Sequence, residues 1–302
     1  MHSTIILNPI SGRGNGLASI PTIKRILDEH QADYSLIQTE YPGHAIELAI
    51  KACEKSDMVV AAGGDGTSNE VINGLMKVKN RDGKTPVMGV IPVGRGNDFA
   101  YSMGIPTQVV EACHFLMNTT PRKVDLGIAY GDNFPAGRYF GNGVGIGFDA
   151  VVGFEAAKMK RLKGFTSYIV AALKTIFIYY KTPHLKVVMD QDTITLSALM
   201  VSIMNGIRMG GGFFMAPKGD PHDTQFDLCC VSQVSKLKTF PLITRFMNGS
   251  QDGHPAVRFF QSKKVVITAM KGSIPAHADG ETICTDGIIS IHKTSTRKTR
   301  IV

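Results

Sequence analysis

The first third of the chain alternates short apolar runs with segments in which apolar residues recur every three or four positions. The apolar runs, which predict strands, are Ser3–Leu7, Tyr34–Gln38, Met58–Ala62 and Val87–Ile91. The periodic segments, which predict helices, are Leu17–Glu29, Ala45–Cys53 and Ser68–Met76. Repeated strand–turn–helix units are typical of a mostly parallel sheet with helices on both faces, so this region is predicted to be an α/β domain.

Beyond Pro121 the pattern changes to short β-rich runs separated by turn residues. The runs that predict strands are Val124–Tyr130, Arg138–Val144, Leu185–Met189, Thr193–Ser202, Phe226–Val231 and Lys264–Thr268. One long helical region, Ala150–Tyr180, interrupts them. This pattern predicts a C-terminal antiparallel β-sandwich-like domain. We therefore expect domains at residues 1–124 and 125–302, with the tail Ile289–Val302 as a candidate to return to the first.

Length and charge narrow the classes of protein that fit. A chain of 302 residues fits two ordinary domains, and its net charge of +8 favours an anionic partner: a nucleotide, a nucleic acid or a membrane surface. The longest apolar stretch, Phe165–Tyr180, is interrupted by Lys174 and is shorter than the roughly 18 residues of a spanning helix. We expect a soluble, cytoplasmic protein. No aromatic–basic platform points to nucleic acid.

The sequence GGDGT at residues 63–67 lies between a predicted buried strand and a predicted helix. Glycines let backbone N–H groups approach phosphate oxygens closely, and the following helix directs its positive end to the same place. Because a carboxylate repels phosphate, Asp65 within such a loop indicates a divalent cation between the two. The alternative is a tight turn in which Asp65 only caps the helix. The spacing matches neither a Walker loop nor a dinucleotide fingerprint.

Two further glycine-rich turns follow predicted strands. They are GRGNG at residues 12–16 and GRGNDFA at residues 94–100. Asn97 and Asp98 offer an amide and a carboxylate that suit the orientation of a substrate hydroxyl or of a metal-bound water; the alternative is a cap on a short helix. Because ligands of parallel sheets bind beyond the carboxyl ends of the strands, we expect the three turns to cluster at that edge.

Taken in order along nearly the whole chain, these motifs resemble the diacylglycerol kinase catalytic domain. Within that superfamily the chain is similar to bacterial lipid kinases related to diacylglycerol and sphingosine kinases. The residues that carry the resemblance are Asn8-Pro9 with Ser11-Gly12, GGDGT with Asn69-Glu70, Gly96–Ala100, Gly141–Gly143, Gly145–Asp149, Asn205-Gly206 with Gly210–Gly212, and Ala278–Glu281.

The resemblance implies an ATP- and Mg²⁺-dependent kinase that phosphorylates the hydroxyl of diacylglycerol or a related lipid. It implies Glu281 as the general base, and Asp65 and Asp98 are the other candidate catalytic residues. Without the resemblance, Glu281 is interpreted as a turn carboxylate. The expected nucleotide-binding residues are Asn8, Pro9, Ile10, Ser11, Gly12, Thr39, Gly64, Asp65, Gly66, Thr67, Ser68, Asn69, Glu70 and Arg95.

Two departures from the family pattern leave other functions open. The family usually has Thr or Ser where Arg95 stands, and a guanidinium there either pairs with phosphate or obstructs the nucleotide. The implied structural metal site uses the carboxylate of Asp223 and carbonyls of Asp220 and Gln225, but Thr224 replaces a glycine and resists a positive φ. The alternatives are an NAD kinase-like enzyme, which shares GGDGT, and a nucleotide-binding regulator without catalysis.

Basic and apolar residues are mixed in the segment that precedes the aromatic part of the long helical region. Such a mixture suits an anionic bilayer surface, although a core-packed helix with a solvated basic face is the alternative. We therefore expect the lipid substrate to be met at an anionic membrane surface, with the protein bound peripherally. The cations predicted to make this contact are Lys158, Lys160, Arg161 and Lys163.

Overall fold

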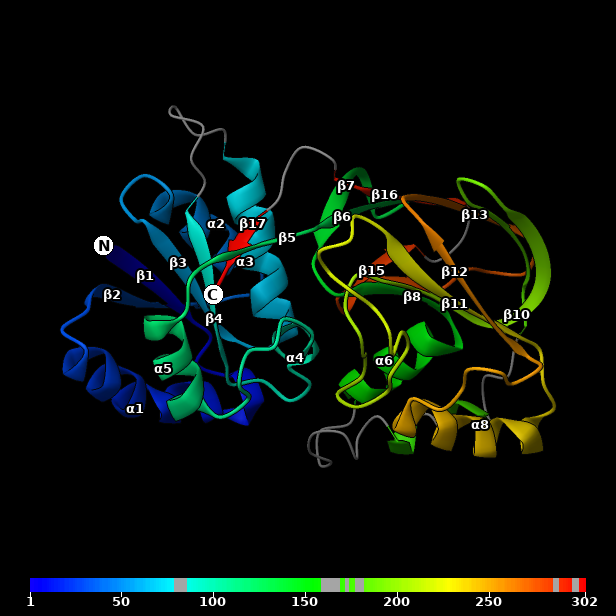
Figure 1. Cartoon of the computed structure of the whole chain (residues 1–302), viewed down its shortest axis with the longest axis horizontal. Coiled ribbons are helices and arrows are strands. Elements are labelled where there is room, and N and C mark those ends of the chain that lie inside the picture. Colours follow the sequence, from blue (N-terminus) through cyan, green and yellow to red (C-terminus); the bar gives the residue numbers. More distant parts are fainter. Residues whose placement is uncertain (79–85, 159–168, 172–173, 177–181, 285–287, 295–298) are drawn as a thin grey trace. The chain divides into compact units, whose positions relative to one another are not determined.

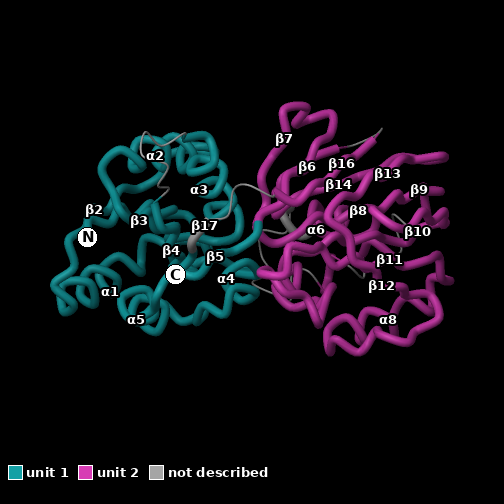
Figure 2. Tube along the Cα trace, turned by 45° about the horizontal axis from the view of Figure 1, so that its top comes forward, with its two compact units in different colours: residues 1–125, 296–302 teal, residues 126–295 magenta. Residues whose placement is uncertain are grey.

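The structure is a computed structural model that describes residues 1–78, 86–158, 169–171, 174–176, 182–284, 288–294 and 299–302. The chain divides into two units. Unit 1 comprises Met1–Asp125 and Thr296–Val302, and unit 2 comprises Leu126–Ser295 (Figure 2). The C-terminal residues therefore belong to the same unit as the N-terminal ones.

Unit 1 alternates strands and helices along most of its length (Figure 1). Its strands are β1 (His2–Leu7), β2 (Asp33–Gln38), β3 (Met58–Gly63), β4 (Val87–Pro92), β5 (Arg122–Val124) and β17 (Thr299–Ile301). Its helices are the 3₁₀ helix η1 (Ser11–Arg13) and the α-helices α1 (Asn15–Glu29), α2 (His44–Ala52), α3 (Asp65–Lys77), α4 (Asp98–Ser102) and α5 (Val109–Asn118).

The strands of unit 1 form one sheet in the order β2-β1-β3-β4-β17-β5. Every pairing is parallel except that of β17 with β5. Helices α1 and α5 cover one face, where Ile23 and Leu116 pack with Ile5 and Val60, while α2 and α3 lie on the other (Figure 1). The predicted α/β domain with a mostly parallel sheet is therefore confirmed.

Unit 2 is built mainly from antiparallel strands. They are β6 (Gly127–Gly131), β7 (Phe134–Phe140), β8 (Gly143–Gly147), β9 (His184–Val188), β10 (Thr193–Met204), β11 (Phe226–Ser232), β12 (Val257–Ser262), β13 (Lys264–Lys271), β14 (Ala276–Ala278), β15 (Glu281–Cys284) and β16 (Ile288–Lys293). They pair in the order β15-β14-β8-β10-β9-β13-β16-β6-β7, and β11 joins β10 to β12. Helices α6 (Phe148–Lys158) and α8 (Lys236–Asn248) accompany them. This confirms the predicted antiparallel β-rich fold.

Two predicted strands are wrong because each joins two separate strands. The predicted run Val124–Tyr130 is broken at Asp125 and Leu126, and its halves, β5 and β6, belong to different sheets. The predicted run Arg138–Val144 is broken between β7 and β8. There the backbone N–H groups of Gly141 and Asn142 donate to a carboxylate instead of a neighbouring strand.

Two predicted helices differ from the structure in their bounds. The helix expected at Ser68–Met76 begins three residues earlier, at Asp65, so the GGDGT motif includes its first turn. In the region expected to be helical from Ala150 to Tyr180, α6 ends at Lys158, and much of the remainder lies outside the described residues. In the described part of the chain, no helix combines the length and apolar composition needed to cross a bilayer.

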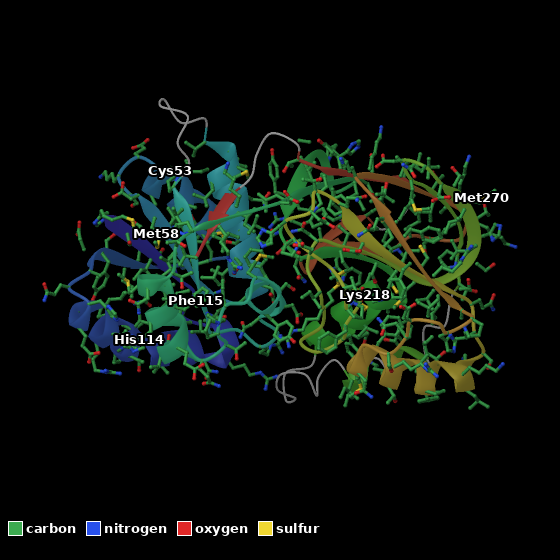
Figure 3. All side chains as sticks on the ribbon, viewed as in Figure 1. Cys53, Met58, His114, Phe115, Lys218 and Met270 are labelled. Carbon is green, nitrogen blue, oxygen red and sulfur yellow. The ribbon has the colours of Figure 1, made fainter. Side chains whose placement is uncertain are left out.

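Side chains separate clearly into core and surface. Met58 of β3 is 4% exposed inside unit 1, whereas Met270 of β13 is 59% exposed on unit 2 (Figure 3). In unit 2, the side chains of Phe140 and Phe226 stack at 5.5 Å within one buried cluster. A second cluster lies beneath α6 and α8 and contains several methionines. Each unit therefore has its own hydrophobic core.

Candidate functional site

The three glycine-rich turns of unit 1 are joined to one another at the carboxyl edge of the sheet. The Asn8 N–H donates to the Ala62 carbonyl at 2.9 Å, and the Val93 N–H donates to the Gly63 carbonyl at 2.9 Å. The Asn8 side-chain amide also donates to the Thr67 hydroxyl at 3.2 Å. The turns that follow β1, β3 and β4 therefore lie side by side, as their positions after parallel strands predict.

Close backbone contacts explain several of the glycines in these turns. A Cβ on Gly16 would lie 2.0 Å from the Asn8 carbonyl oxygen, and a Cβ on Gly94 would lie 2.4 Å from the Gly64 Cα. Such distances are far shorter than any ordinary contact, so packing alone requires glycine there. Gly66 differs, because a Cβ there would have no atom within 4 Å. Gly66 lies exposed in the first turn of α3, where space remains for a ligand.

Asp65, in the first turn of α3, links this helix to α4. Its Oδ1 accepts the Phe99 N–H at 2.9 Å. Asp98, in the first turn of α4, is only 5% exposed. Asn97 precedes this helix in the left-handed conformation, and its side chain bonds the backbone N–H and carbonyl of Gly94 at 3.0 and 3.2 Å. Asn97 therefore shapes the turn, and Asp65 lies next to the start of α4.

Glu70 is engaged at the beginning of another helix. Its carboxylate accepts the N–H groups of Gly43 and Ala45 at 2.9 and 3.1 Å, at the N-terminus of α2. Backbone N–H groups there have no partner within the helix, so an acidic side chain stabilises it. The chain reaches this helix from Thr39, whose N–H donates to the Leu7 carbonyl at 2.8 Å. Glu70 thereby orders the segment that follows Thr39.

Most of the remaining residues predicted to bind the nucleotide offer backbone groups, and not side chains, to a ligand. Thr67, Ser68 and Asn69 are buried in α3, with at most 5% of each residue exposed. A ligand at this end of α3 would therefore meet backbone N–H groups rather than these side chains. Ile10 and Arg95 are exposed, and Pro9, Ser11 and Gly12 lie in and before η1. A pocket of about 330 Å³ beside the turns is lined by Asn15, Ser19, Gly94, Asn97 and Thr107.

In unit 2, the turn that carries Glu281 is held by a carboxylate. Asp279 and Gly280 both have positive φ, 47° and 90°. The Asp279 Oδ2 accepts the Gly141 N–H at 2.8 Å, and its Oδ1 accepts the N–H groups of Asn142 and Gly143 at 3.1 and 2.9 Å. Charge-assisted bonds of this kind are stronger than neutral ones. They bind the turn to the residues between β7 and β8.

Two asparagines add a second layer to this arrangement. The Asn142 carbonyl accepts the N–H groups of Asn205 and Gly206, both at 2.8 Å. In return, the Asn205 side chain donates to the Gly141 carbonyl at 2.6 Å, and the Asn142 side chain donates to the Arg208 carbonyl at 2.9 Å. Motifs that lie far apart in the sequence therefore form one hydrogen-bonded cluster.

Glu281 itself begins β15 and has 41% of its side chain exposed. The Nη2 atom of Arg138 lies 4.0 Å from its Oε1, and the Arg138 side chain is only 10% exposed. The guanidinium of Arg138 is also 5.0 Å from the centre of the Phe134 ring. Sequence reasoning missed Arg138, because within a β-rich run it has no motif to distinguish it. The arrangement leaves a reachable carboxylate beside a buried cation.

The turn expected to hold a metal has the conformation that a glycine would favour. Thr224 has φ 67°, although a β-branched residue is rare in this region, so the expectation that it resists a positive φ is not met. The Asp223 Oδ1 accepts the Gln225 N–H at 2.8 Å, and the Asp220 Oδ1 accepts the His222 N–H at 2.9 Å. Backbone strain of this kind is frequent at functional sites.

The charges near this turn are compatible with a cation. Burial raises the pKa of Asp227, and the neighbouring charge of Asp223 raises it further, although Gln261 and Lys293 oppose the shift. Across the described residues, no three His, Cys, Asp or Glu side chains are grouped as metal ligands. A cation here would therefore rely on one carboxylate and backbone carbonyls. Such oxygen ligands suit a hard divalent cation.

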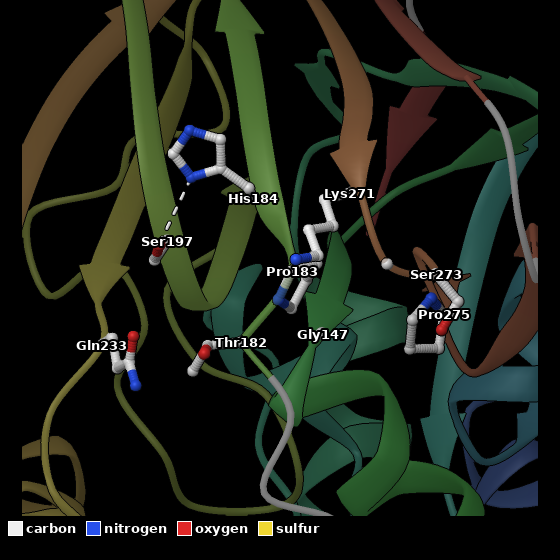
Figure 4. Close-up of a pocket in the computed structure, with 10 residues that line it drawn as sticks. Gly147, Thr182, Pro183, His184, Ser197, Gln233, Lys271, Ser273 and Pro275 are labelled. Atoms are coloured by element: carbon white, nitrogen blue, oxygen red, sulfur yellow. Dashed lines mark hydrogen bonds between the residues drawn. The ribbon is translucent and has the colours of Figure 1, made fainter.

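Unit 2 also has a pocket of about 510 Å³ that contains none of the predicted site residues (Figure 4). His184, Ser197 and Lys271 line it, and the His184 Nδ1 lies 3.3 Å from the Ser197 hydroxyl (Figure 4). Gly147, at the end of β8, forms part of its wall. Sequence reasoning gave no indication of this pocket, because its lining comes from separate strands.

The fold and these two clusters define a protein with a mostly parallel α/β unit and a β-rich second unit. Residues 2–129 match the family model of the diacylglycerol kinase catalytic domain. Residues 142–290 match the model described as the YegS C-terminal NAD kinase beta sandwich-like domain. The two matched segments together cover most of the chain, and they confirm the resemblance to diacylglycerol kinase-type lipid kinases seen in its motifs.

Relatives match over nearly the whole chain. A diacylglycerol kinase of Staphylococcus saprophyticus is 27% identical, over 93% of this chain and 88% of its own length. A diacylglycerol kinase of Bacillus subtilis is 28% identical, over 93% of this chain and 89% of its own length. A crystal structure of a candidate diacylglycerol kinase from Bacillus anthracis superposes with a TM-score of 0.81 at 23% identity, over 100% of this chain and 97% of that one.

Proposed function

We propose that the protein is an ATP-dependent lipid kinase that transfers the γ-phosphate to the hydroxyl of diacylglycerol or a related lipid. The observation that carries this proposal is the meeting of three glycine-rich turns, with Asp65 among them, at the carboxyl edge of a parallel sheet. Relatives named as diacylglycerol kinases support a lipid alcohol as the acceptor.

Unit 1 is assigned to the nucleotide. Backbone N–H groups of the turns and of the start of α3 would bind the phosphates, since the side chains of Thr67, Ser68 and Asn69 are buried. Asp65 would hold Mg²⁺, which when bound neutralises charge on the phosphate oxygens. The acidic residue fits this role because a carboxylate among phosphate-binding turns otherwise repels the ligand. The exposed Arg95 would pair with a phosphate oxygen.

Unit 2 is assigned to the acceptor hydroxyl. Glu281 would orient this hydroxyl and accept its proton as the oxygen attacks phosphorus. Its partly exposed carboxylate can reach a substrate, and the bonds from Asp279 to three backbone N–H groups hold the turn in place. Arg138 lies beside it, with Nη2 4.0 Å from the Glu281 Oε1. Asp98 is also proposed as a catalytic group of unit 1, because the N–H of the next residue, Phe99, donates to Asp65.

A second divalent cation is proposed for unit 2, in a structural role. Asp223 would bind it through its carboxylate, and Asp220 and Gln225 would bind it through their carbonyl oxygens. The positive φ of Thr224 supports this assignment, because the turn keeps its shape despite the side chain. Binding would also lower the repulsion between Asp223 and Asp227.

The lipid would be met at an anionic bilayer surface, from the cytoplasmic side where ATP is present. The net charge of +8 supports this. On α8, Leu237 is 81% exposed between the exposed Lys236 and Lys238, and no acidic residue occupies the first turn. Two lysines at the N-terminus of a helix interact unfavourably with the helix dipole, so their position is better explained by contact with an anionic surface than by helix stability. The four cations expected from the sequence, Lys158 to Lys163, have side chains outside the described residues.

The test is transfer of radiolabelled γ-phosphate to a panel of lipids that includes diacylglycerol and a sphingoid base, with NAD as a competing acceptor. Glu281→Gln should lower kcat far more than it raises the KM for ATP, because it keeps the size but removes the base. Phosphorylation of NAD alone would favour the NAD kinase-like alternative. ATP binding without transfer to any acceptor would favour the regulator.

A further inference from the structure

Three neighbouring strands of unit 2 place Ser202, Gly145 and His277 in one row. β10 pairs with β8 so that Ser202 is opposite Gly145, and β14 pairs with β8 so that His277 is opposite the same glycine. Directly opposed residues of antiparallel strands present their side chains on the same face of the sheet. Ser202 and His277 therefore flank a position that has no side chain.

Asp149, in the first turn of α6, fills this position. A Cβ on Gly145 would lie 2.4 Å from the Asp149 Oδ2 and 2.6 Å from the His277 Nε2, so both atoms border the space that the glycine leaves. Ser202 Oγ donates to the Asp149 Oδ2 at 3.3 Å. Ser202, Asp149 and His277 are all buried, with at most 9% of each residue exposed. Gly145 is thus required to admit the carboxylate between the hydroxyl and the imidazole.

The other ring nitrogen of His277 holds the turn that leads to Glu281. The His277 Nδ1 accepts the Gly280 N–H at 3.1 Å. A nitrogen that accepts an N–H carries no proton, so the neutral ring has its proton on Nε2, which borders the same space at Gly145 as the Asp149 carboxylate. A carboxylate next to Nε2 stabilises this tautomer. A carboxyl group of α6 therefore lies near the side of the ring opposite the nitrogen that binds Gly280.

We infer that Asp149 and His277 are positioning residues for Glu281, in which Asp149 sets the tautomer of His277 and His277 holds the turn through Gly280. Only the last step rests on the proposed function, because Glu281 is a general base only if the protein is a kinase. Asp279 binds the opposite side of the same turn, so the turn is fixed on both sides.

The ionisation of Asp149 depends on the same neighbouring side chains. Burial raises the pKa of Asp149, while the nearby His277 and the Ser202 hydroxyl oppose the shift. The same two side chains that flank Gly145 therefore oppose the effect of burial on the pKa of Asp149, which remains raised. Phe154 of α6 lies 6.5 Å from the His277 ring, which adds an apolar cover.

The first measurement reads the tautomer directly, without any substrate. In ¹⁵N–¹H correlation spectra of the histidine rings, the wild-type His277 signal, identified by its loss in His277→Asn, should report a proton on Nε2. Asp149→Ala should move this proton toward Nδ1 and speed the hydrogen exchange of the Gly280 N–H. Asp149→Asn keeps an acceptor oxygen and should preserve both readouts, which also covers the case that Asp149→Ala fails to fold.

The second measurement reads turnover. His277→Ala should lower kcat on the order of tenfold to a hundredfold with an unchanged KM for ATP, because a small displacement of a catalytic group is enough for such a loss. His277→Asn retains an acceptor for the Gly280 N–H and should remain within about threefold of wild type. The matched control is His254→Ala: its Nδ1 accepts the Ala256 N–H at 3.2 Å, away from the Glu281 turn, and kcat should not change.

Different outcomes overturn the inference and the proposed function. A wild-type His277 with its proton on Nδ1, an unchanged tautomer in Asp149→Ala, or full turnover in His277→Ala would each overturn the inference. If the wild-type protein phosphorylates no lipid, or Glu281→Gln is fully active, the proposed function fails. The spectra would then still decide whether Asp149 and His277 hold the turn.

Discussion

The two candidate sites are held together by different physical means. At the glycine-rich edge of unit 1, backbone groups bond to backbone groups and glycines permit contacts that no side chain could. Around the Glu281 turn of unit 2, the Asp279 carboxylate and the buried amides of Asn142 and Asn205 bond to backbone groups more than sixty positions away along the chain. The first site is therefore sensitive to added volume, and the second to a changed donor or acceptor.

The largest effect is expected at Asp65, and it tests whether a side chain contributes to catalysis at the glycine-rich edge of unit 1. Asp65→Asn should lower kcat on the order of 10²-fold or more, if charge stabilisation is the main catalytic contribution. The asparagine oxygen still accepts the Phe99 N–H, so thermal unfolding should stay near wild type. Glu54→Gln, an exposed acid of the same unit, is the control. Normal turnover of folded Asp65→Asn would remove the metal-linked role.

Two glycines of unit 1 should respond differently to an added methyl group. Gly16→Ala places a Cβ 2.0 Å from the Asn8 carbonyl oxygen and should lower the free energy of unfolding by about 1–3 kcal/mol or more. Gly66→Ala has open space and a helical position, so it should leave stability unchanged or raise it by up to about 1 kcal/mol. Its effect should appear as weaker ATP binding. Urea unfolding and nucleotide titration measure the two effects, and equal losses of stability would contradict the distinction.

Replacing the Asp279 carboxylate, which accepts three backbone N–H groups, should destabilise the Glu281 turn of unit 2. Asp279→Asn tolerates the positive φ of 47°, but its single amide oxygen replaces two carboxylate oxygens that accept three N–H groups. We expect a loss of about 1–3 kcal/mol in stability, from a buried donor left without its partner. Turnover should fall roughly tenfold as Glu281 is displaced. Nucleotide affinity should not change, and a parallel loss of ATP binding would show that the turn is not specific to Glu281.

The buried carboxylate of unit 2 should reveal itself in the pH dependence of stability. Because burial raises the pKa of Asp149, the folded protein binds a proton that the unfolded chain has already released, at pH values between the two pKa values. Within this window the contribution of Asp149 makes wild-type stability fall as pH rises, by at most about 1.4 kcal/mol per pH unit. Asp149→Asn lacks this contribution. Its stability relative to wild type should therefore increase with pH, and a constant difference would argue against a buried ionisable group.

The smallest expected effect concerns an exposed cation at the glycine-rich edge. Arg95→Thr introduces the usual family residue and should weaken ATP binding only about threefold, because exposed ion pairs are screened by water and salt. The difference should shrink as salt is added. Isothermal titration at two salt concentrations measures it. Tighter ATP binding by the variant would mean that Arg95 obstructs the nucleotide.

Much of unit 1 was predictable because its signals are local. Apolar runs, helical periodicity and glycine-rich turns lie next to one another in the sequence, and parallel strands bring their carboxyl ends to one edge. The meeting of GGDGT with the turn after β4 followed from this rule. The contact of Glu70 with the N-terminus of α2 did not, because its partners Gly43 and Ala45 are 25 or more positions away.

For unit 2, the sequence determined the β-rich class and placed Glu281 in a recognisable motif, because apolar patterning and turn residues are read position by position. Only the tertiary structure decided that Asp279 interrupts a predicted strand at Gly141, that Arg138 lies beside Glu281, and that Asp149 fills the space at Gly145. The physical reason is that patterning distinguishes buried from exposed positions, whereas a buried polar group is stable only with its partner. That partner comes from a distant strand or helix, and only the folded chain brings the two together.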